Sequence, residues 1–112
     1  MARLNYVELP VREIGAARRF YEAAFGWSLT DFGPTYAATV TGDTDIGLQA
    51  DPAEATRAPL AVIDVPDLEA ALAAVEAAGG RVVRPIFAFP GGRRFHFLDP
   101  SGNELAAVTA DA

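Results

Sequence analysis

Three groups of side chains in this sequence offer acid–base or ion-binding chemistry. His96 is the one histidine of the chain, and an imidazole can donate or accept a proton near neutral pH. Glu8 lies in a segment of alternating hydrophobicity, where a carboxylate can act as a general base or hold a cationic ligand. Arg93 and Arg94 follow a Pro-Gly-Gly turn and can clamp a carboxylate. Proton transfer and the binding of small ions are therefore the chemistries that the fold must support.

Each of these residues also has a plain structural interpretation, which the sequence leaves open. A single histidine in an aromatic strand is commonly a packed or surface residue, and Glu8 can pair with an arginine. Arginines beside a hairpin turn are commonly solvated. Strand alternation places Arg94 and His96 on one face and Phe95 and Phe97 on the other, without indicating which face would line a binding site.

Two aromatic residues, Trp27 and Tyr36, are candidates to line a pocket and stack on a flat ligand. The alternative is that they belong to the core of the sheet. This alternative applies more strongly to Trp27, which directly follows a helix-ending glycine.

The composition is that of one compact domain. The chain has 112 residues, of which 51% are hydrophobic and 21% charged. Its net charge of −6 argues against nucleic acid as a partner, because phosphate binding needs clustered positive charge. An acidic protein can attract a cationic ligand, although any acidic soluble protein carries such a charge.

The absence of lysine and cysteine excludes several kinds of catalytic and binding site. All positive side chains are arginine, so lysine Schiff bases and P-loop lysines are excluded. Without cysteine, thiol nucleophiles, disulfides and Cys-ligated zinc are excluded as well. No apolar run approaches membrane-spanning length, and the chain opens directly into a strand. We expect a cytoplasmic protein that does not interact with membranes.

Hydrophobic periodicity predicts five elements in the first half of the chain. The alternation of Tyr6 and Glu8 with Val7 and Leu9 is typical of a half-buried strand, and from Ile14 the period becomes helical. A glycine at the end of this helix can adopt the left-handed conformation. The predicted order is strand, helix and three strands, at residues 4–11, 14–26, 27–32, 36–41 and 45–50.

The second half repeats this order after a polar, aperiodic linker at residues 51–58. Pro66-Asp67 indicates a helix start, because the Asp carboxylate accepts bonds from free amides of the first turn. Gly79-Gly80 ends the helix. The predicted strands are 60–65, 81–86, 93–98 and 103–108, with a helix from residue 68, and we expect the last few residues after Val108 to lack order.

The two halves also share residues at one constant offset, which is the signature of an internal repeat. Val11 corresponds to Val65, Gly26 to Gly80, and Ala16-Ala17 and Glu22-Ala23-Ala24 have matching counterparts. We predict an α+β fold of two βαβββ modules, at about residues 3–50 and 59–109. Each curved sheet would cover one face with its helix and leave the other concave, so that two sheets form a cup-shaped half-barrel with the site on the helix-free face.

These motifs resemble the vicinal oxygen chelate superfamily, the glyoxalase, bleomycin-resistance and dioxygenase proteins. The resemblance spans nearly the whole chain and is specific in combination, although most of its motifs are structural. It is carried by Glu8-Leu9-Pro10-Val11, Arg19-Phe20-Tyr21-Glu22, Phe25-Gly26-Trp27, Val65-Pro66-Asp67-Leu68, Ala77-Ala78-Gly79-Gly80 and Asp99-Pro100-Ser101-Gly102-Asn103.

The resemblance implies that catalytic members hold a divalent metal through His and Glu side chains of both modules. Carried over position by position, these ligands fall on Tyr6, Gln49, Leu60 and Ala106. Leu and Ala offer no donor atom, so we expect no metal and no other cofactor at these positions. A displaced site using Glu8 and Glu104 would require a slipped strand register.

The favoured interpretation is a metal-free small-molecule-binding protein that forms a homodimer, as short members of this superfamily commonly do. The alternatives are a metal-independent isomerase or lyase with Glu8 or His96 as its catalytic residue, and a divergent metal-dependent glyoxalase or dioxygenase. The predicted ligand-binding residues are Tyr6, Glu8, Trp27, Tyr36, Gln49, Leu60, Arg94 and His96.

Overall fold

The computed structural model describes residues 1–111 and divides into two compact units. The first unit is Tyr6–Leu60, and the second combines Met1–Asn5 with the residues from Ala61 onward. The first half of the chain contains β1 (Arg3–Pro10), α1 (Ile14–Phe25), β2 (Thr30–Asp31), β3 (Tyr36–Ala38) and β4 (Asp45–Gln49). The second half contains β5 (Leu60–Asp64), α2 (Leu68–Ala77), β6 (Arg81–Phe89), β7 (Gly92–Leu98) and β8 (Glu104–Ala110). The predicted α+β class and the repeated βαβββ order are confirmed.

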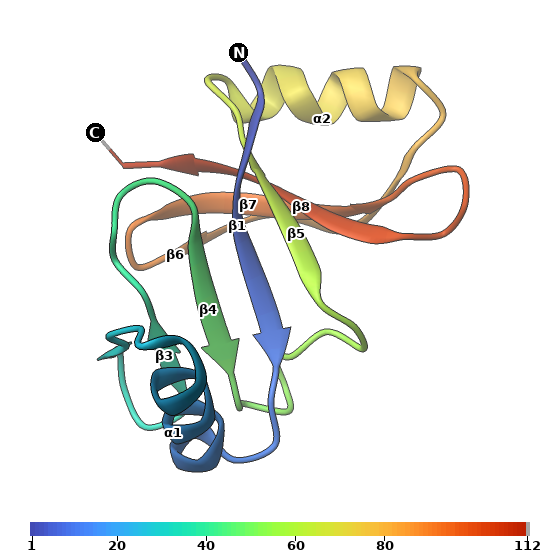
Figure 1. Ribbon diagram of the computed structural model, residues 1–112. Coiled ribbons are helices and arrows are strands. Elements are labelled where there is room, and N and C mark those ends of the chain that lie inside the picture. The colour runs from blue at the N-terminus through green and yellow to red at the C-terminus, as the bar shows by residue number, and fades with distance from the viewer. Residues whose placement is uncertain (112) are drawn as a thin grey trace. The chain divides into compact units, whose positions relative to one another are not determined.

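In the first unit, α1 covers one face of a sheet with the strand order β2-β3-β4-β1 (Figure 1). The strands β1 and β4 are parallel, and the other neighbours are antiparallel. The buried core consists of Leu29, Ala37 and Leu48, against which side chains of β1 and α1 pack. Because side chains alternate along a strand, the neighbours of these core residues point away from the helix.

The second unit repeats this arrangement with the strand order β5-β8-β7-β6 and with α2 packed on β6, β7 and β8 (Figure 1). Here β5 and β8 are the parallel pair. The core is formed by Val65, Leu68, Phe95 and Ala107, and the helix contributes further apolar side chains to it. Because Phe95 faces α2, its neighbours Arg94 and His96 must lie on the helix-free face. The structure thereby answers the orientation question that alternation alone left open.

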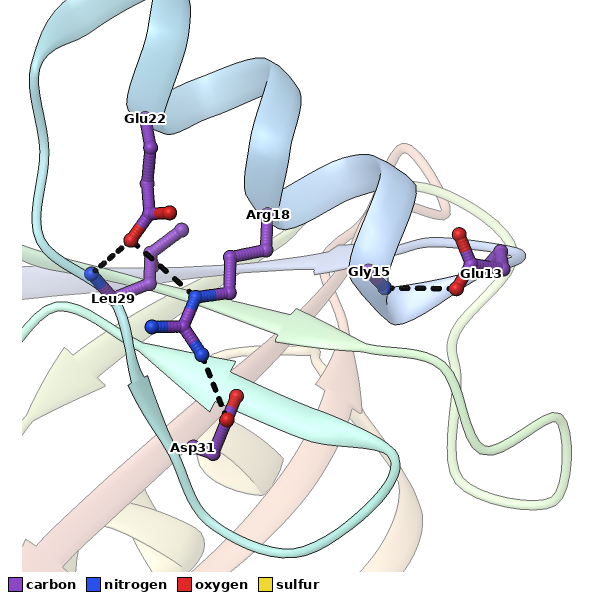
Figure 2. A network of polar contacts seen from close by, with 6 residues as sticks. All are labelled: Glu13, Gly15, Arg18, Glu22, Leu29 and Asp31. Carbon is purple, nitrogen blue, oxygen red and sulfur yellow. Dashed lines mark hydrogen bonds and ion pairs between the residues drawn. The ribbon is translucent and has the colours of Figure 1, made fainter.

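A polar network fixes α1 at both ends (Figure 2). The Glu13 side chain caps the helix by accepting from the backbone N–H groups of Gly15 and Ala16. Glu22 accepts from Leu29 N–H at 3.1 Å and from Arg18 Nε at 3.3 Å. Arg18 in turn contacts the Asp31 carboxylate at 2.7 Å, so the network ties the helix to β2.

The strand predicted for residues 27–32 is wrong for most of its length, since only Thr30–Asp31 forms. The Trp27 ring stacks on the rings of Tyr21 and Phe25, at centroid distances of 5.7 and 5.3 Å. The Leu29 N–H donates to a helix carboxylate instead of a neighbouring strand. Contacts with α1 therefore take the place of the strand pairing that was predicted for residues 27–29.

The strand predicted for residues 36–41 ends at Ala38, because the Asp45 carboxylate forms hydrogen bonds with the residues that follow. Asp45 Oδ1 accepts from Thr39 Oγ1 at 2.7 Å and from the Thr41 N–H at 2.9 Å, while Oδ2 accepts from the Gly42 N–H at 3.1 Å. These bonds hold the pKa of Asp45 below its usual value, against the opposing effect of burial. The result is a compact turn before β4.

The last three strands are longer than predicted. β6 extends to Phe89 and β7 begins at Gly92, because Pro90 and Gly91 alone make the turn, with Gly91 at φ 109°. β8 continues to Ala110, which pairs with Gly92. The expectation of disorder after Val108 is therefore wrong for residues 109 and 110. Within the described part of the chain, neither helix has the length and apolar character needed to cross a membrane.

Candidate functional site

On the helix-free face of the first unit, Tyr6, Glu8, Tyr36 and Gly47 form a buried polar group, here called the Glu8 cluster. Glu8 is only 2% exposed and lies opposite Gly47 in the β1–β4 pairing. The Tyr36 hydroxyl donates to Glu8 Oε1 at 3.1 Å, and the Tyr6 and Tyr36 hydroxyls lie 2.5 Å apart. Three predicted site residues are thus brought together around one carboxyl group.

The hydrogen bonds of this cluster have a defined direction. A tyrosine hydroxyl has one hydrogen, so Tyr36, which donates to Glu8, must accept from Tyr6. Burial, followed by the proximity of Tyr6 and Glu8, raises the pKa of Tyr36 above its ordinary value. Tyr36 therefore stays protonated near neutral pH, and the chain runs from Tyr6 through Tyr36 to Glu8.

Gly47 is required by the close approach of the two tyrosines. A Cβ atom built on Gly47 would lie 2.1 Å from the hydroxyl oxygens of both Tyr6 and Tyr36. We expect Gly47→Ala to displace both hydroxyls and to lower the free energy of unfolding by about 1–2 kcal/mol. Urea denaturation measures this loss. The same substitution in a Tyr6→Phe, Tyr36→Phe background removes the clash with both hydroxyls and leaves only the ring carbon Cζ of residue 36 close to the methyl group, at 2.8 Å. It should therefore cost less, and an equal cost would contradict the assigned clash.

On the helix-free face of the second unit lies the His96 cluster, which consists of Arg84, Phe87, Phe89, Arg94, His96 and Glu104. The His96 ring lies 5.8 Å from the Phe87 ring and is 2% exposed. The guanidinium carbon of Arg84 is 3.6 Å from the Phe87 ring centroid, and that of Arg94 is 5.4 Å from it. A buried imidazole is therefore placed beside aromatic rings and two guanidinium groups.

The two ring nitrogens of His96 differ in their surroundings. Nδ1 lies 2.8 Å from Glu104 Oε2. Because a carboxylate oxygen accepts hydrogen bonds, the Nδ1–H of His96 is the donor of this bond. Among the residues that the structure describes, Nε2 is a buried nitrogen with no hydrogen-bond partner. Burial lowers the pKa of His96, Glu104 opposes this, and the Arg94 and Arg84 charges add to it. The neutral ring thus carries its proton on Nδ1 and presents a lone pair at Nε2.

This lowered pKa predicts a pH dependence of stability. Above the ordinary value of 6.5, the histidine is neutral in both the folded and the unfolded chain. Below it, the unfolded chain binds a proton that the folded chain resists, so stability is lost as the pH falls from that value. We expect wild type to lose stability more steeply than His96→Gln between about pH 7 and pH 5, by up to about 1.4 kcal/mol per pH unit. Parallel urea titrations of the two proteins would contradict this if their slopes agreed.

The remaining predicted site residues lie in other surroundings. Trp27 is 39% exposed and stacks against α1, so it does not share the helix-free face of the Glu8 cluster. Gln49 pairs with Tyr36 across the sheet, and its Oε1 accepts from the Asp51 N–H at 3.0 Å. Leu60 is fully buried.

The two arginines of β7 lie on opposite faces of that strand. Arg93 lies on the α2 side and donates to the Glu69 carboxylate at 2.7 Å, whereas Arg94 belongs to the His96 cluster.

The residues at the family's ligand positions do not fit a divalent metal. Leu60 and Ala106 are both 0% exposed hydrocarbon side chains without a donor atom. The Tyr6 hydroxyl is hydrogen-bonded to Tyr36, and Gln49 caps a turn. Over residues 1–111, no three His, Cys, Asp or Glu side chains come close enough together to hold an ion.

Sequence reasoning missed Arg84, Phe87 and Phe89 as members of the His96 cluster. β6 contains irregularities in its pairing with β7, between Val82 and Arg84 and between Arg84 and Phe87. Such bulges break the alternation from which faces are read. Glu104 was noted only as a displaced metal ligand, and its bond to His96 depends on the β7–β8 register.

Comparison with known proteins assigns the sequence to a family. The model of the Glyoxalase/Bleomycin resistance protein/Dioxygenase superfamily matches residues 3–107. No curated protein sequence matches the chain.

Solved structures share the fold. The methylmalonyl-CoA epimerase from Mycobacterium tuberculosis is 17% identical, with a TM-score of 0.76 over 97% of this chain and 88% of that chain. A superfamily member from Vibrio splendidus 12B01 is 16% identical, with a TM-score of 0.71 over 97% and 99% of the two chains. The Mn(II)-bound glyoxalase from Novosphingobium aromaticivorans is 23% identical, with a TM-score of 0.66 over 97% of this chain and 40% of that chain. The chain belongs to the Glyoxalase/Bleomycin resistance protein/Dioxygenase superfamily.

Proposed function

We propose that this protein binds a small organic molecule at the His96 cluster without using the metal-ligand positions of its superfamily. The observation that carries the proposal is the buried His96 Nε2, which has no hydrogen-bond partner while Nδ1 is held by Glu104. Leaving a buried polar atom unsatisfied costs about 1–3 kcal/mol. A ligand that bonds to Nε2 would offset this cost.

The surroundings of His96 support ligand binding. Phe87 and Phe89 provide apolar contact area, and Arg84 and Arg94 provide hydrogen-bond donors beside it. This combination of apolar walls with a few fixed polar groups is typical of small-molecule sites. The fully buried Leu60 and Ala106 support the part of the proposal that excludes the usual metal ligands.

The test is a ligand-observed NMR screen of small acids, amines and glycopeptide antibiotics against wild type and His96→Phe. Phenylalanine fills a similar volume but offers no acceptor, so ligands of this site should lose binding in the variant. Arg93→Gln is the matched control, because Arg93 lies on the other face of the same strand and should retain them. Ligands that bind wild type and His96→Phe equally would contradict the proposed location.

A second candidate is a metal-independent isomerase or lyase, favoured by the hydrogen-bond chain from Tyr6 through Tyr36 to Glu8. A buried carboxyl group in such a chain is suited to proton transfer, with His96 as the other candidate. Solved relatives with the same fold include epimerases of methylmalonyl-CoA. A Glu8→Gln variant that keeps ligand binding but loses turnover would favour this enzyme, whereas loss of binding without turnover in wild type would favour the binding protein.

The third possibility, a divergent metal-dependent glyoxalase or dioxygenase, is tested by metal analysis. Purified protein incubated with nickel, zinc or manganese should retain far less than one ion per chain after dialysis. Stoichiometric retention would overturn the metal-free part of the proposal and direct attention to Glu8 and Glu104.

The proposal includes a cytoplasmic homodimer. Apolar side chains that are more than half exposed in the single chain, such as Phe20 and Phe25 on α1, are candidates for burial between copies. Sedimentation velocity at micromolar concentration should give the mass of two chains. A monomeric mass at all concentrations would remove the dimer from the proposal.

A further inference from the structure

We infer that two copies of the chain pair through α1, in an antiparallel two-fold arrangement centred on Phe20. This inference rests on the homodimer of the proposed function and specifies the surface that forms it. Three features of α1 support it: the separation of its charged and apolar flanks, the exposed aromatic area at its end, and the order of small and large side chains along it.

The exposed surface of α1 has a charged flank and an apolar flank. Successive helical residues are about 100° apart, so Arg18, Arg19 and Glu22 share one flank. Arg18 and Glu22 are bonded to each other, to Asp31 and to the Leu29 N–H (Figure 2). A second copy with the same net charge of −6 can approach the other flank without bringing like charges together. That flank, here called the Phe20 face, consists of four exposed residues: Ala16, Phe20, Ala23 and Ala24.

The Phe20 face continues into a group of aromatic rings at the carboxyl end of α1. Tyr21 contacts Phe20 edge to face at 5.0 Å and stacks with Phe25 and Trp27 at 6.3 and 5.7 Å. Phe20 and Phe25 are 59% and 60% exposed, and Trp27 is 39% exposed. At about 200 Å² per aromatic side chain, the exposed parts of these three amount to roughly 300 Å² per copy. This is more than a third of the about 800 Å² that each partner buries in a standard interface.

Small side chains are placed symmetrically about Phe20. Ala16 precedes it by four residues and Ala24 follows it by four, while Ala17 and Ala23 stand three residues away on either side. In an antiparallel pair with its two-fold axis at Phe20, Ala16 of each copy lies opposite Ala24 of the other. The alanines allow the helix axes to approach to about 8 Å, and the two Phe20 rings meet at the axis. The face is therefore complementary to itself, as a two-fold interface requires.

The two ends of α1 favour the antiparallel direction. The Arg19 guanidinium lies over Gly15 near the amino end, beside the Glu13 carboxylate that caps the helix. The carboxyl end exposes the Phe25 ring and has no basic residue in its last turn. Antiparallel pairing brings Arg19 of each copy to the carboxyl end of the other, where the helix dipole and the aromatic ring attract a cation. Parallel pairing would instead place the two Arg19 charges side by side.

Phe20→Glu tests whether the Phe20 face forms the dimer. The substitution places two carboxylates at the axis and should raise the dimer dissociation constant about 100-fold or more, measured by sedimentation velocity. Phe32→Glu is the matched control, because Phe32 is 55% exposed but lies outside the Phe20 face, and it should keep the wild-type constant. Circular dichroism checks that both variants fold. A dissociation constant unchanged by Phe20→Glu would overturn the inference.

Cysteine cross-linking tests the direction, because the chain has no cysteine of its own. Ala16→Cys and Ala24→Cys chains should form a disulfide with each other when they are mixed and oxidised. Neither variant should cross-link with itself, since antiparallel pairing separates the two copies of either residue by about 12 Å along the helix, beyond the span of a disulfide. Cross-linking of each variant with itself, or no cross-linking of the mixture, would overturn the inference.

Arg19→Gln tests the charge at the carboxyl end of the partner helix. It should raise the dimer dissociation constant about tenfold. Arg57→Gln, at an exposed arginine of the linker, is the matched control and should leave the constant unchanged. Equal constants for Arg19→Gln and Arg57→Gln would contradict the role assigned to Arg19.

The fluorescence of Trp27 gives an independent measurement, since it is the one tryptophan of the chain. Wild type diluted until the dimer dissociates should show a red shift of its emission, because the indole becomes more exposed to water. Phe20→Glu should show the red-shifted emission at all concentrations. Emission that stays constant while wild type dissociates would place Trp27 outside the interface and contradict the pairing.

These results separate the inference from the proposed function. A wild-type dimer that Phe20→Glu leaves intact would be formed by another surface, so the inference would be wrong and the proposed homodimer would stand. A monomeric mass of wild type at all concentrations would overturn both. Ligand binding at the His96 cluster is decided separately, by the NMR screen with His96→Phe.

Discussion

Phe95→Ala should lower the free energy of unfolding by about 3–5 kcal/mol, the largest effect expected for a single substitution in this chain. Phe95 is 0% exposed and packs with Val65, Leu68 and Ala107 beneath α2. Truncation removes most of a large apolar side chain and leaves a cavity that the neighbouring sheet cannot easily fill. Guanidinium denaturation followed by circular dichroism measures the loss.

Phe32→Ala is the matched control for this measurement, because Phe32 is 55% exposed. Its truncation should change the unfolding free energy by less than about 1 kcal/mol. A loss below that value for Phe95→Ala would mean that Phe95 does not face the core. It would also remove the basis for placing Arg94 and His96, its neighbours on β7, on the helix-free face.

Tyr36→Phe has the second largest expected effect, a loss of about 2–3 kcal/mol. The substitution removes the bond that Tyr36 donates to Glu8 Oε1 and the bond that it accepts from Tyr6. Both lie in a region where Glu8 is 2% exposed, so water does not readily replace the lost partner. The measurement is again the free energy of unfolding in denaturant.

Tyr6→Phe is the control that tests the direction of the chain. Tyr6 donates the outer bond, so its loss leaves the bond from Tyr36 to Glu8 intact and should cost about 1 kcal/mol. A larger loss for Tyr6→Phe than for Tyr36→Phe would reverse the assigned order. Tyr36→Phe, Tyr6→Phe together should cost little more than Tyr36→Phe alone, because the two residues share one bond.

Much of the fold was predictable because its local signals agree with its long-range packing. The alternation of Tyr6 and Glu8 with Leu9 puts the first two on one face of the strand, and because Leu9 packs against the core under α1, that face is the helix-free one. The start of α1 at Ile14 and its glycine cap at Gly26, with φ 70°, follow equally local rules. The βαβββ repeat then followed from element order alone.

The composition of the His96 cluster was not predictable, for a geometric reason. Arg84 pairs with His96 and Phe87 with Arg94, so three steps along β6 match two steps along β7. The extra residue brings Arg84 and Phe87 to one face, although strict alternation would place them on opposite faces. At Trp27, strand propensity led to a wrong prediction. The ring stacks on Tyr21 and Phe25 of α1, and residue 27 does not join a strand.

In each repeat the first strand pairs in parallel with the last strand, which has a consequence for biosynthesis. Tyr6 pairs with Asp45 and Ala61 with Leu105, so β1 and β5 must wait for the last strand of their own repeat before they gain these hydrogen bonds. Contacts so distant along the chain slow folding. On the ribosome, the nascent β1 therefore stays without its β4 partner until the first repeat has left the exit tunnel, and β5 pairs with β8 only after residues up to Ala110 have emerged.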